Sequence, residues 1–118
     1  MNSNEYQIEA NKTIPSNEHY KNAKHNLDII AINAALGLAG ETGELVDLIK
    51  KSSFQGHILD KNEIEKEMGD IFWYLNLMCQ AYHLSFEDIM EKNIEKLRKR
   101  YGEKFDSNKS INREEYQK

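Results

Sequence analysis

A chain of 118 residues is long enough for one domain with a single hydrophobic core, and too short for two. Its net charge of −4, with no basic stripe interleaved with aromatic residues, argues against a nucleic-acid partner. We also expect no membrane span and no secretory leader, because no apolar run reaches about 18 residues and no apolar segment opens the chain. Cys79 is the only cysteine, which excludes an internal disulfide, and we expect a cytoplasmic protein.

Helical periodicity interrupted by turn signals predicts an all-α chain, because no stretch alternates polar and apolar residues for long enough to form a sheet. Asp60 and Ser85 should each cap a helix, since a carboxylate follows each of them three residues later. In chain order we expect a helix over about 4–13, a break at Pro15 and residues 16–19, a helix over about 26–51, a loop over 52–59 with Gly56 as its hinge, a helix over about 60–82 and a helix over about 85–99.

These elements favour a four-to-five-helix bundle as a single domain over residues 1–105, followed by a polar tail over 106–118. Apolar residues make up 39% of the chain, which is lean for a soluble monomer. A small helical domain rarely buries enough apolar surface alone. We therefore expect oligomerisation to complete the bundle.

Two acidic pairs stand at i, i+3 spacing on the two central helices: Glu41 with Glu44, and Glu67 with Asp70. This spacing places both carboxylates of a pair on one helix face. Glu41 and Glu67 also occupy positions where the apolar rhythm of their helices calls for a core residue. A carboxylate facing a core is costly unless it is paired or binds a metal. The pattern predicts a shared Mg²⁺ or Mn²⁺ site, and the alternative is a pair of solvated faces with lysine salt bridges.

Three polar residues of the last strong helix, Asn93, Lys96 and Arg100, follow one another at intervals of three and four and so share a face. Such a face could neutralise a polyphosphate, although it is also an ordinary basic helix end. Tyr74, one turn after Asp70, could stack on a base. Three glycines at positions 37, 40 and 43 indicate either close helix packing or room for a nucleotide, and the sequence favours neither.

The chain resembles a known family in four segments. Residues 36–51 (LGLAGETGELVDLIKK) and 67–75 (EMGDIFWYL) are similar to the two halves of the MazG-type signature. Residues 92–102 (KNIEKLRKRYG) resemble the closing helix of the family, where a proline often stands in place of Gly102, and residues 4–13 (NEYQIEANKT) resemble the start of single-domain members. The resemblance covers about residues 4–105 and identifies the chain with the all-α nucleoside triphosphate pyrophosphohydrolases.

This resemblance implies Mg²⁺-dependent hydrolysis of nucleoside triphosphates to a monophosphate and pyrophosphate, in nucleotide-pool house-cleaning. The four acidic residues would be the metal ligands, with Glu41 or Glu44 accepting a proton from water. The resemblance assigns substrate binding to four further residues, Asn93, Lys96, Arg100 and Tyr74, and more weakly to two N-terminal ones, Gln7 and Thr13. It also implies a homodimer or homotetramer.

Three alternatives remain beside this reading. The first is a dedicated dUTP or dCTP pyrophosphatase, and the second is a relative of the phosphoribosyl-ATP pyrophosphatases. The third belongs to another class: a non-catalytic helical module that binds a nucleotide or metal for regulation.

Overall fold

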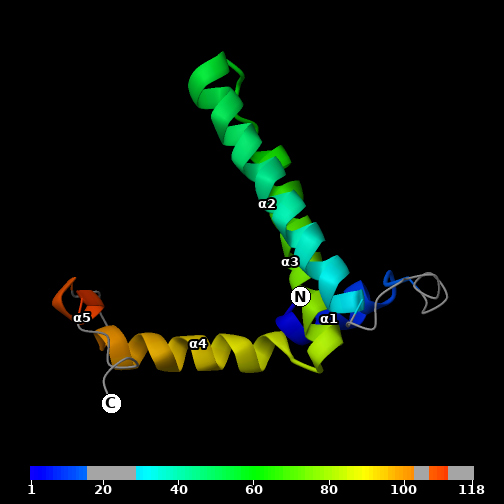
Figure 1. Cartoon of the computed structure of the whole chain (residues 1–118), viewed down its shortest axis with the longest axis vertical. Coiled ribbons are helices and arrows are strands. Elements are labelled where there is room, and N and C mark those ends of the chain that lie inside the picture. Colours follow the sequence, from blue (N-terminus) through cyan, green and yellow to red (C-terminus); the bar gives the residue numbers. More distant parts are fainter. Residues whose placement is uncertain (16–28, 103–106, 112–118) are drawn as a thin grey trace. The chain divides into compact units, whose positions relative to one another are not determined.

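Every regular element of the described residues, which are 1–15, 29–102 and 107–111 of this computed structural model, is a helix. The predicted all-α class is therefore confirmed. The helices are α1 (Ser3–Asn11), α2 (Ile29–Gln55), α3 (Lys61–Tyr82), α4 (Phe86–Tyr101) and α5 (Ser107–Ile111) (Figure 1).

The helix starts follow the capping signals in the sequence. Asp60 accepts a hydrogen bond of 2.9 Å from the backbone N–H of Asn62, and the Ser85 hydroxyl accepts one of 3.2 Å from that of Asp88. Both bonds satisfy a backbone donor that has no partner within the helix. The two caps predicted from sequence are thus confirmed, and Asn2 caps α1 in the same way.

One predicted boundary is wrong. Residues 52–55, expected in a loop, continue α2 because nothing before Gly56 breaks a helix; Gly56 then ends it with a φ of +72°, which suits a residue without a Cβ. The short α5, residues 107–111, lies within the predicted polar tail over 106–118. The start of the predicted long helix, 26–28, and the polar residues 16–19 lie outside the described residues.

The chain divides into two compact units, Met1–Leu84 and Ser85–Lys118, so that α1 to α3 belong to the first and α4 and α5 to the second. Within the first unit α2 and α3 lie side by side (Figure 1). Among the described residues of this unit, the buried apolar ones are few and mostly small: Ala10, Ala31, Ala34, Leu77 and Cys79. The described part of this core is small for a chain of this length.

Side-chain amides, rather than apolar contacts alone, fasten α1 to α3. Gln7 donates a hydrogen bond of 2.9 Å to Asn76, whose own amide donates one of 2.8 Å to Asn11. The Trp73 indole N–H donates to the Thr13 hydroxyl at 2.7 Å. Because Asn76 is completely buried, these bonds satisfy an amide that water cannot reach.

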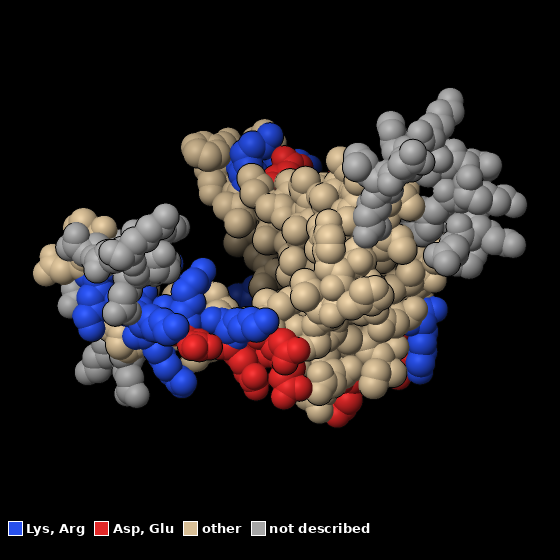
Figure 2. Space-filling model, turned by 60° about the horizontal axis from the view of Figure 1, so that its bottom comes forward, with Lys and Arg blue, Asp and Glu red and all other residues tan. Residues whose placement is uncertain are grey.

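Charge is segregated along α4 in the second unit, with acidic side chains near its start and basic ones near its end (Figure 2). Glu87 and Asp88 lie in the first turn, and Arg98, Lys99 and Arg100 lie in the last. This order matches the helix macrodipole and stabilises the helix at both ends.

Helix α2 is long and apolar enough to qualify as a membrane span by length and composition, which the sequence did not lead us to expect. Core helices of soluble proteins meet the same criteria, so this observation is weak. Only Ala31 and Ala34 of α2 are buried within the described chain. The helix also carries Glu41 and Glu44, whose charges lipid would penalise.

Candidate metal centre

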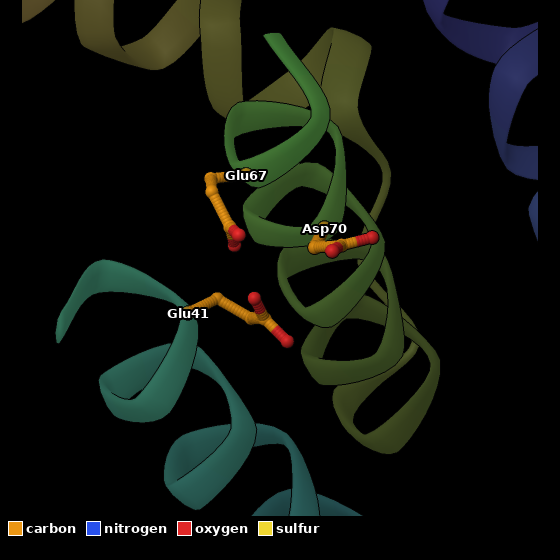
Figure 3. Close-up of side chains that lie close together, drawn as sticks. All are labelled: Glu41, Glu67 and Asp70. Atoms are coloured by element: carbon orange, nitrogen blue, oxygen red, sulfur yellow. The ribbon is translucent and has the colours of Figure 1, made fainter. Parts of the chain in front are cut away.

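Three carboxylates from two helices meet in the first unit. Glu41 projects from α2 toward Glu67 and Asp70 of α3 (Figure 3). One carboxyl oxygen from each residue lies within 4.8 Å of the other two. Glu41 and Glu67 are half-buried, whereas Asp70 is exposed. The structure thus brings together three of the four acidic residues that the spacing singled out.

The charges of this cluster repel one another. A hydrogen bond with Glu67 raises the pKa of the Glu41 carboxyl, and burial and the charges of Asp70, Glu67 and Glu44 raise it further. Like charges at close range disfavour ionisation of both members of such a pair. A bound cation would relieve the same repulsion.

Glu67 carries the observation that best fits a cation ligand. Its Oε2 atom is buried and has no hydrogen-bond partner among the described residues. None of the ion pairs seen in the described parts of the chain involves the cluster, so lysine salt bridges do not account for it there. A buried carboxylate oxygen without a donor is costly, and a divalent cation would satisfy it. An all-oxygen donor set suits a hard ion such as Mg²⁺ or Mn²⁺.

Glu44 lies one turn further along α2, is exposed and stands outside the group of three. Its surroundings are basic as well as acidic. Lys51 forms an ion pair of 2.9 Å with Asp47, and this partner, followed by Glu44 and Glu63, raises the pKa of the lysine. The role of Glu44 as a metal ligand stays a prediction.

Tyr74 packs against the backbone of α2. A Cβ atom placed on Gly37 would overlap the Tyr74 ring. The neighbouring Trp73 ring forms a T-shaped pair with the Tyr74 ring, with centroids 5.1 Å apart. Gly37 therefore serves close helix packing, whereas a Cβ on Gly40 or Gly43 would meet nothing within 4 Å. Contact of Tyr74 with a nucleotide remains a prediction.

Gln7 and Thr13, the N-terminal candidates for substrate binding, both belong to the network that fastens α1. The centre of that network, Asn76, was not singled out from the sequence. The signal available was a lone amide within the apolar run 71–79, at a position that faces inward. The substrate roles of Gln7 and Thr13 stay predictions.

Asn93, Lys96 and Arg100 lie on one face of α4, as their spacing predicted. They belong to the second unit, which does not contain the carboxylate cluster. The Arg100 guanidinium lies over the Tyr101 ring, 5.6 Å from its centroid. Contact of Asn93, Lys96 and Arg100 with a polyphosphate stays a prediction, because the fold of each unit by itself does not test it.

A comparison with protein families gives a match over residues 32–105 to the model of the MazG nucleotide pyrophosphohydrolase domain. The chain belongs to this family. The matched region contains both acidic pairs and most of α2 together with α3 and α4, so the resemblance predicted from the signature halves is confirmed. Comparisons with curated proteins and with solved structures gave no significant match.

Proposed function

We propose that this MazG-family chain hydrolyses (deoxy)nucleoside triphosphates to a nucleoside monophosphate and pyrophosphate, with Mg²⁺ as its cofactor and Mn²⁺ as a substitute. The observation that carries the proposal is the cluster of Glu41, Glu67 and Asp70, with its buried and unpartnered Glu67 oxygen. Removal of unwanted nucleotides in the cytoplasm is the role that fits this reaction.

In this proposal Glu41, Glu67 and Asp70 hold the cation. A divalent cation in such a site lowers the pKa of a bound water and neutralises charge that builds on the phosphates. Glu44, exposed one turn from Glu41, completes the ligand set through a change of rotamer or accepts the proton of the attacking water. In either role, the Glu44 carboxylate has to reach the cation site across only one helical turn.

For the substrate we assign the phosphates to Asn93, Lys96 and Arg100 and the nucleoside to Tyr74. The support for the first assignment is the shared face of α4, on which Arg100 can make bidentate contacts and Lys96 a point-charge contact. The support for the second is the position of Tyr74, one turn after Asp70 on α3.

We also propose that the active form is a homodimer or homotetramer. Large apolar side chains on the outer face of the first unit are uncovered: Leu36 is 70% exposed, Val46 58% and Phe54 83%. Single exposed apolar residues are ordinary, but several along one helix mark an interaction surface. Light scattering should give a mass above that of one 13.8-kDa chain. The Val46→Glu variant should lower that mass, whereas Asn62→Glu, at an exposed site on the first turn of α3, should not.

The catalytic proposal is tested by incubating the full chain with canonical and modified nucleoside triphosphates and Mg²⁺ while pyrophosphate release is followed. We expect release that depends on the metal and is lost in Glu41→Gln and Asp70→Asn, with helical content unchanged. A panel that includes dUTP and dCTP reveals a dedicated enzyme by its preference. Binding of a nucleotide without turnover would contradict the proposal and favour a regulatory module, and full activity in both variants would contradict the site.

A further inference from the structure

The contact between Gly37 and Tyr74 is the tightest approach that any glycine of α2 makes. A methyl group on Gly37 would overlap the Cδ1, Cε1 and Cζ atoms of the Tyr74 ring. Gly40 and Gly43 lie in the same helix, and a methyl group on either would meet nothing within 4 Å. A glycine inside a helix costs about 0.5–1 kcal/mol relative to alanine. At position 37 a glycine is needed despite this cost, because a larger residue would overlap the Tyr74 ring.

This contact lies next to the carboxylate cluster. Gly37 precedes Glu41 by four residues on α2, and Tyr74 follows Asp70 by four residues on α3. Four residues amount to about one helical turn, or roughly 6 Å along the axis. The contact is therefore the first packing layer beside the cluster along both helices.

The next layer beyond it is closed. Ala34, one turn before Gly37, and Leu77, one turn after Tyr74, are both completely buried. On the other side of the cluster Glu44 is exposed. The carboxylates thus lie at the border between a tightly packed and an open stretch of the α2–α3 pair. On the packed side, the Tyr74 ring is the side chain that separates the two helices next to the cluster.

We propose that Gly37 and Tyr74 form a spacer that fixes the separation of α2 and α3 at the cluster and thereby sets its affinity for a divalent cation. Glu41 comes from one helix and Glu67 and Asp70 from the other, so the distance between their oxygens depends on that separation. Mg²⁺ and Mn²⁺ accept only a narrow range of ligand distances. This inference rests on the proposed metal site and deepens it.

A side chain at position 37 would act on the helices because the ring cannot easily move aside. The Trp73 and Tyr74 rings pack in a T-shaped pair, and helical side chains have few allowed χ1 values. Parting of the helices around the closed Ala34–Leu77 layer is then the remaining response. Gly37 and Tyr74 are positioning residues in this role, since neither needs to touch the cation.

The test measures Mn²⁺ binding by titration calorimetry on the full chain without nucleotide. Gly37→Ala should weaken Mn²⁺ binding about tenfold or more, which is the usual cost of disturbing groups that orient metal ligands. Gly40→Ala and Gly43→Ala are the matched controls, because they make the same substitution in the same helix without a neighbour. Both should bind Mn²⁺ as the parent chain does and melt at a slightly higher temperature.

Variants of Tyr74 test the same spacer from the other helix and do not require Gly37→Ala to fold. Tyr74→Phe keeps the ring and should keep Mn²⁺ affinity, whereas Tyr74→Leu removes the spacer and should lower it. In the double variant G37A/Y74L the methyl group gains room, so the combined loss should be smaller than the product of the single losses.

The outcomes separate this proposal from the one on which it rests. Failure of the parent chain to bind Mn²⁺ would overturn the metal site itself. Normal Mn²⁺ binding by the parent chain, by Gly37→Ala and by Tyr74→Leu would overturn the spacer and leave the metal site standing. Equal weakening in Gly37→Ala and in the two control variants would also overturn it, because the effect would then belong to helix propensity and not to the ring.

Discussion

The side-chain oxygen of Asn76, completely buried in α3, accepts a hydrogen bond of 2.9 Å from the amide of Gln7 in α1. The same oxygen accepts a second bond of 3.2 Å from Gln80, and the Asn76 amide nitrogen donates to Asn11 at 2.8 Å. One buried amide thus joins α1 to α3 with its donor and its acceptor both in use. The attachment of α1 depends on polar geometry more than on apolar area.

Asn76→Leu should therefore be strongly destabilising although the side chains are similar in size. The change removes the acceptor of the Gln7 amide and the donor to Asn11, and the loss of buried hydrogen-bond partners costs about 1–3 kcal/mol. Urea denaturation monitored by circular dichroism measures the loss. The exposed pair Lys12 and Glu9 provides a control, since Lys12→Ala should change stability by less than about 0.5 kcal/mol. Equal stability of Asn76→Leu and the parent chain would contradict this account.

Thr13→Val should loosen the end of α1 and change the surroundings of the only tryptophan. The Thr13 hydroxyl accepts the 2.7 Å bond from Trp73 and donates one of 2.7 Å to the Ala10 carbonyl. Valine has the same shape without either capacity. We expect a shift of the fluorescence maximum, which reports Trp73 alone because the chain has no other tryptophan. Thr13→Ser keeps the hydroxyl and should leave the emission unchanged.

The metal-free protein should lose stability as the pH rises above the ordinary Glu pKa of 4.5. The pKa of Glu41 is raised in the folded chain, chiefly by its hydrogen bond with Glu67, so the folded state binds the proton more tightly than the unfolded state. This stabilisation is complete below 4.5 and is lost as the pH passes the raised pKa. The Asp47 pKa is lowered, chiefly by Lys51, and its contribution is lost only as the pH falls below the ordinary Asp value of 3.8.

Thermal melting in the presence of a chelator, from pH 4.5 toward neutrality, measures this dependence. Glu41→Gln removes the titrating group and should flatten the curve, with a melting temperature at neutral pH above that of the parent chain. Added Mg²⁺ should reverse the order of the two proteins, because only the parent chain retains all the proposed ligands. A parent curve that rises with pH over this range would contradict the raised Glu41 pKa.

Removal of single carboxylates should rank the ligands. Glu67→Gln should weaken Mn²⁺ binding more than Glu44→Gln, because Glu67 belongs to the group within 4.8 Å and Glu44 stands outside it. We expect the Mn²⁺ affinities of the two variants to differ about tenfold, which is the lower end of the loss seen when groups around a metal are altered. Calorimetric titration of both variants measures it, and Glu63→Gln, one turn before Glu67, serves as a control for net charge. A larger loss in Glu44→Gln would show that the bound state draws in the fourth carboxylate.

Local signals in the sequence predicted much of the secondary structure. The caps at Asp60 and Ser85 depend on neighbouring residues only, which is why they are correct. The wrong boundary, at 52–55, concerns the end of α2, and intrinsic preference at a helix end is too weak to fix its last residue.

The sequence by itself determined the helical class, the family and the faces on which Glu41 and Glu67 stand, because these follow from spacing along single helices. Which carboxylates meet depended on how α2 lies against α3, and this placed Asp70 in the cluster and Glu44 outside it. The spacer formed by Gly37 and Tyr74 likewise could not be predicted from the sequence. Their contact joins residues 37 positions apart, and only the tertiary packing of the two helices brings such residues together.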